Sequence, residues 1–389
     1  MTVTPEQMEI QALAREFAGK EIAPHAEAWD AARHIPDEVF GKLAELGFMG
    51  MLIPEGYGGL ELDLSTYLLV LEELARADAS VALSVAIHNG PVPQILLDHG
   101  SETQRRDWLP RLASGEVLGA FALSEADAGS DAGAVACTAG RDGQDWVLDG
   151  TKAWVTNGGR AGLVMTFART GAGTMGCFLV DPSTPGFKVA RRVTTMGHRA
   201  SETVDLTLSG VRLGPDALVG DPARGLSYAL ESLVVGRAGV AAHALGIAQA
   251  SLDHSVRYSL EREQFGRPLA DFGATQAKLA NMAARISAVR ASLHEVGERL
   301  QAQRGGVMDS EVGTEALSAR AAGAKLLASE TAMYASDEAV QIFGGYGYMR
   351  DYPVERLMRD AKGTEIFEGT SEIMRVVIAR EIIRAARGS

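Results

Sequence analysis

A single glutamate near the C-terminus stands in a segment that suits proton transfer. Residues 366–373 read IFEGTSEI, and a helix is predicted to begin directly after the acid at Glu368. Two apolar residues before the acid favour dry surroundings, in which a carboxylate takes up a proton readily once a substrate excludes water. The same position also suits a solvated glutamate that complements the dipole of the next helix. From this segment alone, the second interpretation is preferred.

Two segments in the middle of the chain combine hydroxyls, an aromatic ring and glycine. Residues 121–131 read FALSEADAGSD, a strand that runs into a polar loop, and residues 154–158 read WVTNG. Hydroxyls can bond the polar edge of a cofactor, and glycine permits close approach of the backbone. Taken singly, an ordinary turn explains the first segment and a structural tryptophan explains the second.

Two later segments suit the binding of a phosphate-bearing ligand. Residues 261–268 read EREQFGRP, and an arginine there can bind phosphate through two parallel hydrogen bonds. Residues 341–347 read QIFGGYG, with three glycines in four positions at the end of a predicted helix. One glycine is enough to end a helix, so the surplus favours a backbone surface that lies against a ligand.

A further glycine motif argues against a nicotinamide enzyme. Residues 171–176, GAGTMG, match the dinucleotide fingerprint G-x-G-x-x-G. That fingerprint requires a helix to open at its last glycines, whereas the continuation here, CFLVDP, reads as a strand. The motif is therefore predicted to be a hairpin loop between two strands.

The elements that must position these segments form three blocks, and the predicted fold is α+β and multidomain. Residues 1–116 are predicted to be an N-terminal helical domain, with capping boxes that start at Thr4 and Ser101 and apolar residues at helical spacing over 8–32. Residues 117–222 carry short runs of Val, Thr and aromatics, which predict a middle antiparallel β-barrel or sandwich. Residues 223–389 contain long Ala- and Leu-rich segments, which predict a C-terminal four-helix bundle.

The bulk composition narrows the class of protein further. The formal net charge is −13 and no basic tract occurs, which disfavours a nucleic-acid partner. The two cysteines, Cys137 and Cys177, do not indicate a disulfide framework or a metal site. Neither a secretory signal nor a run of about 18 apolar residues is recognised, so a cytoplasmic protein without a membrane span is expected.

Taken together, the five segments resemble the acyl-CoA dehydrogenase family. They occur in the family's order over about 250 residues, and the helix–sheet–helix plan is also that of the family. Residues 236–253, GRAGVAAHALGIAQASLD, are most similar to the short-chain members. The sequence departs from the common pattern at Ala126, where proline is frequent, and at Phe367, where tyrosine is frequent. Both departures affect the shape of the pocket more than the type of reaction.

The resemblance implies that FAD is the cofactor and assigns residues to it. The flavin contacts would be Phe121, Leu123, Ser124, Ser130, Trp154 and Thr156. A neighbouring subunit would contribute Arg262, Phe265, Gln276, Gln341, Gly344 and Gly345, and Thr370 and Glu372 would complete the cofactor site. The acyl-CoA substrate would meet Ser130, Arg237, Phe367 and Gly369.

The resemblance also implies the chemistry and the partners. Glu368 would act as the catalytic base in an α,β-dehydrogenation of an acyl-CoA to trans-2-enoyl-CoA, as in fatty acid metabolism. A homotetramer built as a dimer of dimers would pass electrons to an electron-transferring flavoprotein. Three alternatives stay open: a dehydrogenase of an acyl group on a carrier protein, an acyl-CoA oxidase, and a catalytically silent acyl-CoA-binding protein.

Overall fold

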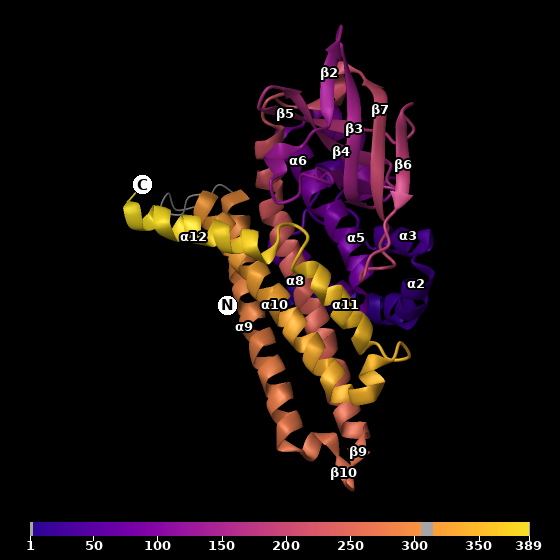
Figure 1. The fold of residues 1–389 in the computed structure, drawn as a ribbon, viewed down its shortest axis with the longest axis vertical. Helices are drawn as coiled ribbons and strands as arrows, with labels where there is room; N and C mark the ends of the chain where they lie inside the picture. The colour runs from indigo at the N-terminus through magenta and orange to yellow at the C-terminus, as the bar shows by residue number, and fades with distance from the viewer. Residues whose placement is uncertain (1–2, 305–313, 389) are drawn as a thin grey trace.

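The chain folds as helices, then a sheet, then helices again, as predicted (Figure 1). The computed structural model describes residues 3–304 and 314–388. The N-terminal helices are α1 (Pro5–Phe17), α2 (Ala26–Ala32), α3 (Asp37–Glu45), α4 (Leu64–Ala77), α5 (Ala79–Asn89), α6 (Pro91–His99) and α7 (Glu102–Ala113). The C-terminal helices are α8 (Gly225–Glu261), α9 (Gly273–Arg304), α10 (Thr314–Phe343), α11 (Val354–Thr364) and α12 (Ser371–Arg387).

The N-terminal helices confirm both capping boxes and the helical spacing over 8–32. The side chains of Thr4 and Ser101 each accept a hydrogen bond from the backbone of the third helical residue, and a glutamine returns the bond. Residues 8–32 are helical, as their spacing predicts, but a π-helical turn (Ala18–Ile22) and a 3-10 turn (Ala23–His25) separate α1 from α2. Pro24 lies in this break, where it cannot donate the backbone hydrogen bond that a continuous helix needs.

The middle of the chain forms one mixed sheet of eight strands. The strands are β1 (Gly119–Ala122), β2 (Thr138–Asp142), β3 (Asp145–Thr156), β4 (Leu163–Gly171), β5 (Thr174–Val180), β6 (Phe187–Arg192), β7 (Thr203–Leu213) and β8 (Leu218–Val219). Their order is β6-β7-β3-β2-β4-β5-β8, with β1 beside β4. As predicted, the GAGTMG motif lies at the turn between β4 and β5, which pair as an antiparallel hairpin.

The prediction of a purely antiparallel sheet is wrong at β4. Strand β1 runs parallel to β4, with Gly119 opposite Leu163, and β2 meets β4 in parallel at the pair Thr138 and Arg169. Alternation of apolar residues shows that a strand is half-buried but not which way its neighbour runs. Parallel neighbours need a long crossover connection, and the β2–β3 hairpin lies within the connection from β1 to β4.

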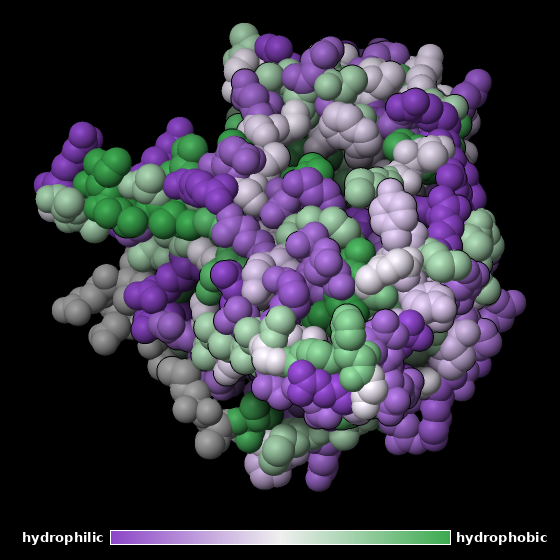
Figure 2. Space-filling model, turned by 60° about the horizontal axis from the view of Figure 1, so that its bottom comes forward, coloured by the Kyte–Doolittle hydropathy of each residue, from purple (hydrophilic) through white to green (hydrophobic). Residues whose placement is uncertain are grey.

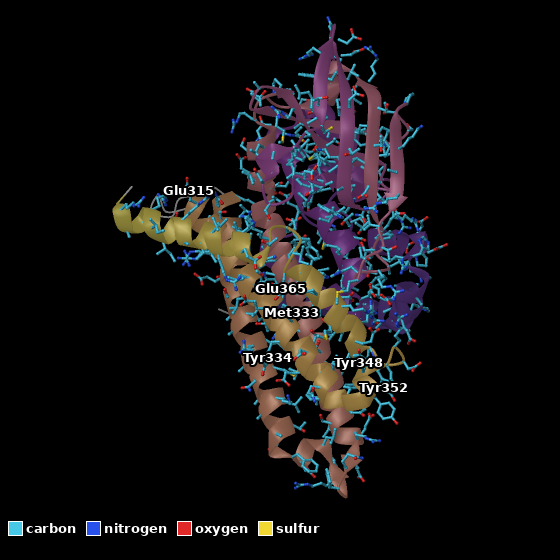
Figure 3. The ribbon with its side chains drawn as sticks, viewed as in Figure 1. Glu315, Met333, Tyr334, Tyr348, Tyr352 and Glu365 are labelled. Atoms are coloured by element: carbon cyan, nitrogen blue, oxygen red, sulfur yellow. The ribbon has the colours of Figure 1, made fainter. Side chains whose placement is uncertain are left out.

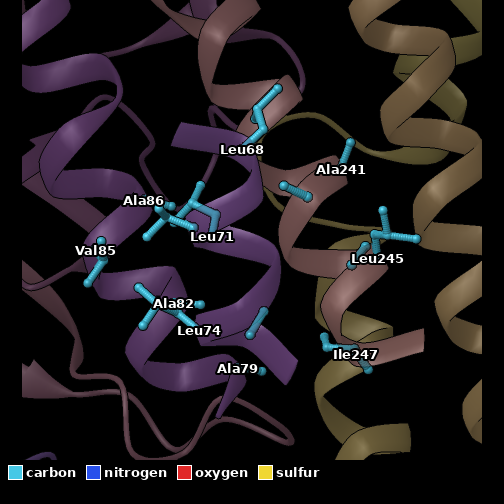
Figure 4. Packing of buried hydrophobic residues seen from close by; sticks show 14 of the residues in the cluster. Leu68, Leu71, Leu74, Ala79, Ala82, Val85, Ala86, Ala241, Leu245 and Ile247 are labelled. Carbon is cyan, nitrogen blue, oxygen red and sulfur yellow. The ribbon is translucent and has the colours of Figure 1, made fainter. Parts of the chain in front are cut away.

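Helix α8 is the central element of the helical core. In Figure 4, Leu71 and Leu74 of α4 lie beside Ala82 and Ala86 of α5, and Leu245 and Ile247 of α8 belong to the same buried cluster. By length and composition α8 could cross a membrane, although polar residues such as Arg237 and His243 interrupt its apolar residues. However, 83% of its most apolar 18-residue window is buried inside the protein, as is usual for a core helix.

Helices α4 and α8 approach closely because Gly246 has no side chain. A Cβ atom at Gly246 would lie 2.4 Å from the Glu72 carbonyl oxygen and 2.7 Å from the Ala75 Cβ atom. Backbone atoms cannot move aside as a flexible side chain can, so even a methyl group would force the helices apart.

We expect Gly246→Ala to lower the free energy of unfolding by about 1–3 kcal/mol, the usual cost of overpacking a core. Gly41 in α3 provides the matched control, because a Cβ atom there would meet nothing within 4 Å. Gly41→Ala should be neutral or stabilise the protein by up to about 1 kcal/mol, since alanine favours a helix interior. Urea unfolding of both variants measures the difference, and equal stability of the two would contradict this account.

Candidate active site

Glu368 lies in the turn between α11 and α12, in a conformation that few non-glycine residues adopt. Its φ is 55° and that of Gly369 is 98°, so two successive residues are left-handed. The turn is closed by a hydrogen bond of 2.9 Å from the Ser371 N–H to the Glu365 carbonyl, and Figure 3 labels Glu365 at its start. Thr370 then caps α12 by accepting from the Ile373 N–H at 3.3 Å. A left-handed glutamate costs of order 1–3 kcal/mol, a strain that is common at functional sites.

The carboxyl group of Glu368 faces the protein interior. The residue as a whole is partly buried, but its Oε2 atom is shielded from solvent and has no hydrogen-bond partner among the described residues. A Cβ atom at Gly236 of α8 would lie 2.4 Å from this oxygen, so the carboxyl group occupies the space that the glycine leaves. Burial raises the pKa of the Glu368 carboxyl to about 7, and the positive charges of Arg237 and Lys325 oppose that rise.

Unpaired polar atoms gather around this carboxyl group. The Tyr67 hydroxyl on α4, the Arg237 Nε on α8 and Glu368 Oε2 are all buried without a partner in the described part of the chain. Gly239 lies one helical turn beyond Gly236, and a Cβ atom there would be 3.3 Å from the Tyr67 hydroxyl. Buried polar groups are nearly always hydrogen-bonded in native proteins, so unpaired groups from three elements indicate a place for a polar ligand.

An aromatic cluster packs against Phe367, next to Glu368 in this turn. The Phe367 ring is 5.4 Å from the ring of His198 and 6.1 Å from that of His243, measured between centroids. The two imidazoles lie 3.2 Å apart at Nε2, and burial lowers the pKa of both, so they stay neutral at physiological pH. The side of the turn that carries Phe367 is therefore aromatic and uncharged.

The structure brings the predicted middle-domain residues together at the ends of β1 and β3. The Ala153 N–H donates to the Ser124 carbonyl at 2.9 Å, which places the segment 121–124 beside 154–156. Trp154 lies at an irregularity of β3 with φ of 56°, and 51% of its surface is exposed. The hydroxyls of Ser124 and Thr156 have no hydrogen-bond partner within the described ranges. Phe121 is half-buried, Leu123 is buried, and Ser130 is exposed in the following loop.

A second group of predicted residues lies at the tip of the helical bundle. Arg262 follows α8 directly, Phe265 is 95% exposed in the turn between β9 (Glu263–Gln264) and β10 (Arg267–Pro268), and Gln276 begins α9. The Arg262 guanidinium lies 5.6 Å from the Tyr346 ring, so the structure brings it to the glycine-rich segment that follows α10. Within the described residues Arg262 forms no ion pair, which leaves its charge available to a phosphate.

Two of the three glycines in this segment are favoured by the structure, each for a different reason. Gly347 is required by packing, because a Cβ atom there would lie 2.4 Å from the Val340 carbonyl oxygen. Gly344 has a φ of 62°, which favours glycine. Gly345 has an ordinary φ and open space around it, so neither argument requires glycine there. The backbone of Gly345 is exposed and lies near the exposed side chain of Gln341, so a ligand could approach it closely.

The two groups of predicted cofactor residues lie apart within one chain. In Figure 1 the β9–β10 tip and the sheet are at opposite ends of the long axis. Thr370 and the exposed Glu372 belong to neither group, because they begin α12 beside Glu368. An exposed aromatic ring with unpaired hydroxyls fits a flavin ring, and an unpaired arginine beside bare backbone fits a diphosphate. The donor sets thus suit the two halves of FAD.

Sequence reasoning missed two of the residues that surround Glu368. Tyr67 lies on a helix whose apolar pattern resembles an ordinary core helix. Lys325 is fully buried in α10, within AAGAKLLASE. A lone lysine among alanines and leucines was the available signal for the second residue, because an unpaired lysine is rarely buried without a reason. No comparable signal marked Tyr67.

One chain thus carries a shielded, unpaired carboxyl group and, elsewhere, an exposed aromatic surface with unpaired hydroxyls. The chain belongs to the acyl-CoA dehydrogenase family. The models of that family's N-terminal, middle and C-terminal domains match residues 4–116, 120–211 and 223–383. The reaction of the chain is therefore the FAD-dependent dehydrogenation of an acyl-CoA thioester.

Full-length relatives agree with this assignment. An acyl-CoA dehydrogenase of Bacillus subtilis is 41% identical over 98% of this chain and 99% of the relative. The short-chain specific acyl-CoA dehydrogenase of Bos taurus mitochondria is 40% identical, over 96% of this chain and 89% of the relative.

Solved structures show the same fold and the cofactor of the family. Butyryl-CoA dehydrogenase from Megasphaera elsdenii matches with a TM-score of 0.94 at 36% identity, over 99% of this chain and all of the other. A glutaryl-CoA dehydrogenase from Mycobacterium smegmatis, solved in complex with FADH2, matches with a TM-score of 0.91 at 32% identity, over 99% and 95% of the two chains.

The raised pKa of Glu368 predicts how a substitution changes stability with pH. A folded pKa of about 7, above the ordinary 4.5, means that this group's stabilisation is complete below pH 4.5 and is lost as pH rises through 7. Glu368→Gln does not titrate, so we expect it to exceed wild-type stability by about 3 kcal/mol at pH 8 and by little at pH 5.

Thermal unfolding at the two pH values, at equal FAD saturation, measures this difference. Glu365→Gln is the matched control, because it removes a carboxylate from the same turn that already pairs with Lys362 at 2.6 Å. That control should not stabilise the protein. A Glu368→Gln gain that is the same at pH 5 and pH 8 would rule out an ionised, buried Glu368.

Proposed function

We propose that Glu368 is the base that removes the α-proton of the acyl-CoA substrate. The carrying observation is the enclosed, unpaired Oε2 atom, which no hydrogen bond among the described residues occupies. A carboxylate in direct contact with arginine would be a weak base, because an ion pair holds its pKa low. Burial raises the pKa of Glu368 to about 7, and Arg237 and Lys325, which form no ion pair with it in the described part of the chain, oppose that rise only at longer range. That value suits proton abstraction at neutral pH.

The residues that would hold FAD follow from the two donor sets. Phe121, Leu123, Ser124, Trp154 and Thr156 would hold the flavin ring, Thr370 and Glu372 would complete its site, and Arg262, Phe265, Gln276, Gln341, Gly344 and Gly345 would come from another subunit. When bound, FAD supplies the acceptor for the hydride that leaves the substrate β-carbon. The chain itself excludes water, holds Glu368 in place and aligns the thioester, which Ser130, Arg237, Phe367 and Gly369 would contact.

We also propose the assembly and its partner. The protein would be a cytoplasmic homotetramer, built as a dimer of dimers, that reduces an electron-transferring flavoprotein. The separation of the two cofactor groups within one chain supports shared sites between subunits (Figure 1). Helix α12 extends from the body and exposes Val376, Ile382 and Ile383, which appear as the green arm in Figure 2. A chain from a structural study of the electron transferring flavoprotein of Acidaminococcus fermentans matches with a TM-score of 0.93 at 38% identity.

We further propose short or short-branched acyl chains as substrates. The aromatic cluster of Phe367, His198 and His243 would close the pocket beside the base and exclude long chains by overlap. The likeness to short-chain and butyryl enzymes supports the same choice. Anaerobic titration of the purified flavoprotein with acyl-CoAs of increasing length tests it, because the substrate bleaches the flavin. Greatest kcat/KM on a long chain would contradict the proposal, and bleaching only by a carrier-bound acyl group would favour that alternative.

Removal of the carboxylate should abolish most proton abstraction without loss of binding. We expect Glu368→Gln to retain FAD and acyl-CoA affinity and to reduce the rate of flavin bleaching by at least about 10²–10⁴-fold. In the wild type, kcat/KM should fall as pH drops through about 7, because Glu368 must be ionised. Anaerobic stopped-flow absorbance measures both effects. Near-normal bleaching by Glu368→Gln would show that the base lies elsewhere.

The contact between Gly236 and Glu368 predicts that the base can be moved to α8. A side chain at position 236 would start 2.4 Å from the present Oε2, so it can extend into the space that Glu368→Gly vacates. Gly236→Glu combined with Glu368→Gly should recover about tenfold or more of the activity that Glu368→Gly loses. Gly236→Gln with Glu368→Gly is the control of equal size without a base, and recovery by that control would refute the mechanism.

Shared cofactor sites predict that assembly and FAD binding are linked. Light scattering should give a mass near four times 41.1 kDa with about one FAD per chain. Arg262→Ala should lose FAD on less dilution than the wild type does, because Arg262 forms no ion pair among the described residues and its charge is available to the cofactor phosphates. An active, flavin-loaded monomer would contradict the shared site, and rapid turnover with NAD alone would contradict the proposed acceptor.

A further inference from the structure

Lys325 makes a contact with the catalytic turn that the mechanism above does not use. Its side chain is 0% exposed in the middle of α10, and its Nζ donates to the Gly369 carbonyl at 2.7 Å. Gly369 has a φ of 98° and directly follows Glu368. A glycine in this region has no side chain to restrict its rotation, so the lysine hydrogen bond restrains the direction of this peptide from inside the protein, in addition to the Ser371–Glu365 bond and the Thr370 cap.

A neutral donor would satisfy the Gly369 carbonyl, so the charge of Lys325 needs its own explanation. Burying an ammonium group costs several kcal/mol unless a negative charge compensates it. Among the described residues Lys325 forms no ion pair within 4 Å, and Glu368 is the acid with the largest electrostatic effect on it, ahead of Glu365 and Glu372. Burial lowers the pKa of Lys325 to about 8, while the Glu368 charge opposes that shift.

We propose that Lys325 is a positioning residue for the base: it fixes the Glu368–Gly369 turn through the Gly369 carbonyl and compensates the Glu368 carboxylate without contacting it. A direct contact would remove the lone pair that must accept the substrate proton. A cation held by the neighbouring carbonyl stabilises the ionised base and leaves that lone pair free. Arg237, whose Nη1 donates to Ser318 Oγ at 3.2 Å, faces the same carboxyl group from α8, and Tyr67 faces it from α4. The inference rests on Glu368 as the base.

Three substitutions separate the hydrogen bond from the charge. Lys325→Met removes both, Lys325→Gln keeps a donor without charge, and Lys325→Arg keeps the charge. Lys362→Met is the matched control, because Lys362 lies at the surface near the same turn and pairs with Glu365. If charge compensation operates, Met and Gln should both raise the pKa of Glu368, whereas Arg and the Lys362 variant should leave it near the wild-type value.

The titration of Glu368 can be measured directly in the holoenzyme without turnover. The infrared carbonyl band of its protonated form is isolated by subtracting the spectrum of Glu368→Gln in each background. We expect the midpoint to shift upward by on the order of one pH unit in Lys325→Met and Lys325→Gln. The acid limb of the stopped-flow bleaching rate should shift equally, with about a tenfold loss below the midpoint. Lys325→Met should lose more than Lys325→Gln at high pH, because only the former also releases the turn.

Two results would overturn the proposal. One is an unchanged Glu368 midpoint in both neutral variants. The other is failure of all three Lys325 variants to accumulate as holoenzyme while Lys362→Met does, which would make Lys325 a structural residue only. Failure of the proposed base is a separate outcome: Glu368→Gln would then bleach normally, whatever the Lys325 variants do.

Discussion

The site depends on keeping one carboxylate out of water without giving it a partner. Glu368 is enclosed by α4, α8 and its own turn, and two cations lie near it but not in ion-pair contact. Full burial alone would leave the acid protonated, and a salt bridge would leave it too weak a base. The intermediate arrangement gives a group that is both ionisable near neutral pH and free to accept a proton.

This requirement explains several features that otherwise look unfavourable. The left-handed φ of Glu368 directs its side chain towards α8, where Gly236 and Gly239 leave space that any side chain would fill. The buried Arg237 and Lys325 are costly by themselves, and each has a hydrogen bond to a neutral group that holds it in position. The close approach of α4 and α8 at Gly246 keeps these elements at fixed separation, so the pocket cannot relax around the charge.

The proposed cofactor surface differs from the site of Glu368. Its residues are exposed to solvent, whereas the carboxyl group of Glu368 is enclosed. Trp154 and Phe265 present large aromatic surface to solvent, and the hydroxyls of Ser124 and Thr156 lack partners in the described part of the chain. Exposed aromatic residues and unused donors are unfavourable in an isolated chain. The proposed shared site would cover them with a flavin and a second subunit and would thereby link cofactor binding to assembly.

The sequence by itself determined the order of the blocks, the capping boxes and the hairpin nature of GAGTMG, and it singled out Glu368 as the proposed base. These depend on local patterns, such as cap residues, strand composition and the ordered motifs of the family. The tertiary structure decided the parallel pairing of β1 with β4, the break at Pro24 and the partners of Glu368. Gly236, Tyr67 and Lys325 lie far from Glu368 in the chain and meet it only through helix packing. Periodicity identifies the buried side of a helix, but not which distant residue that side will face.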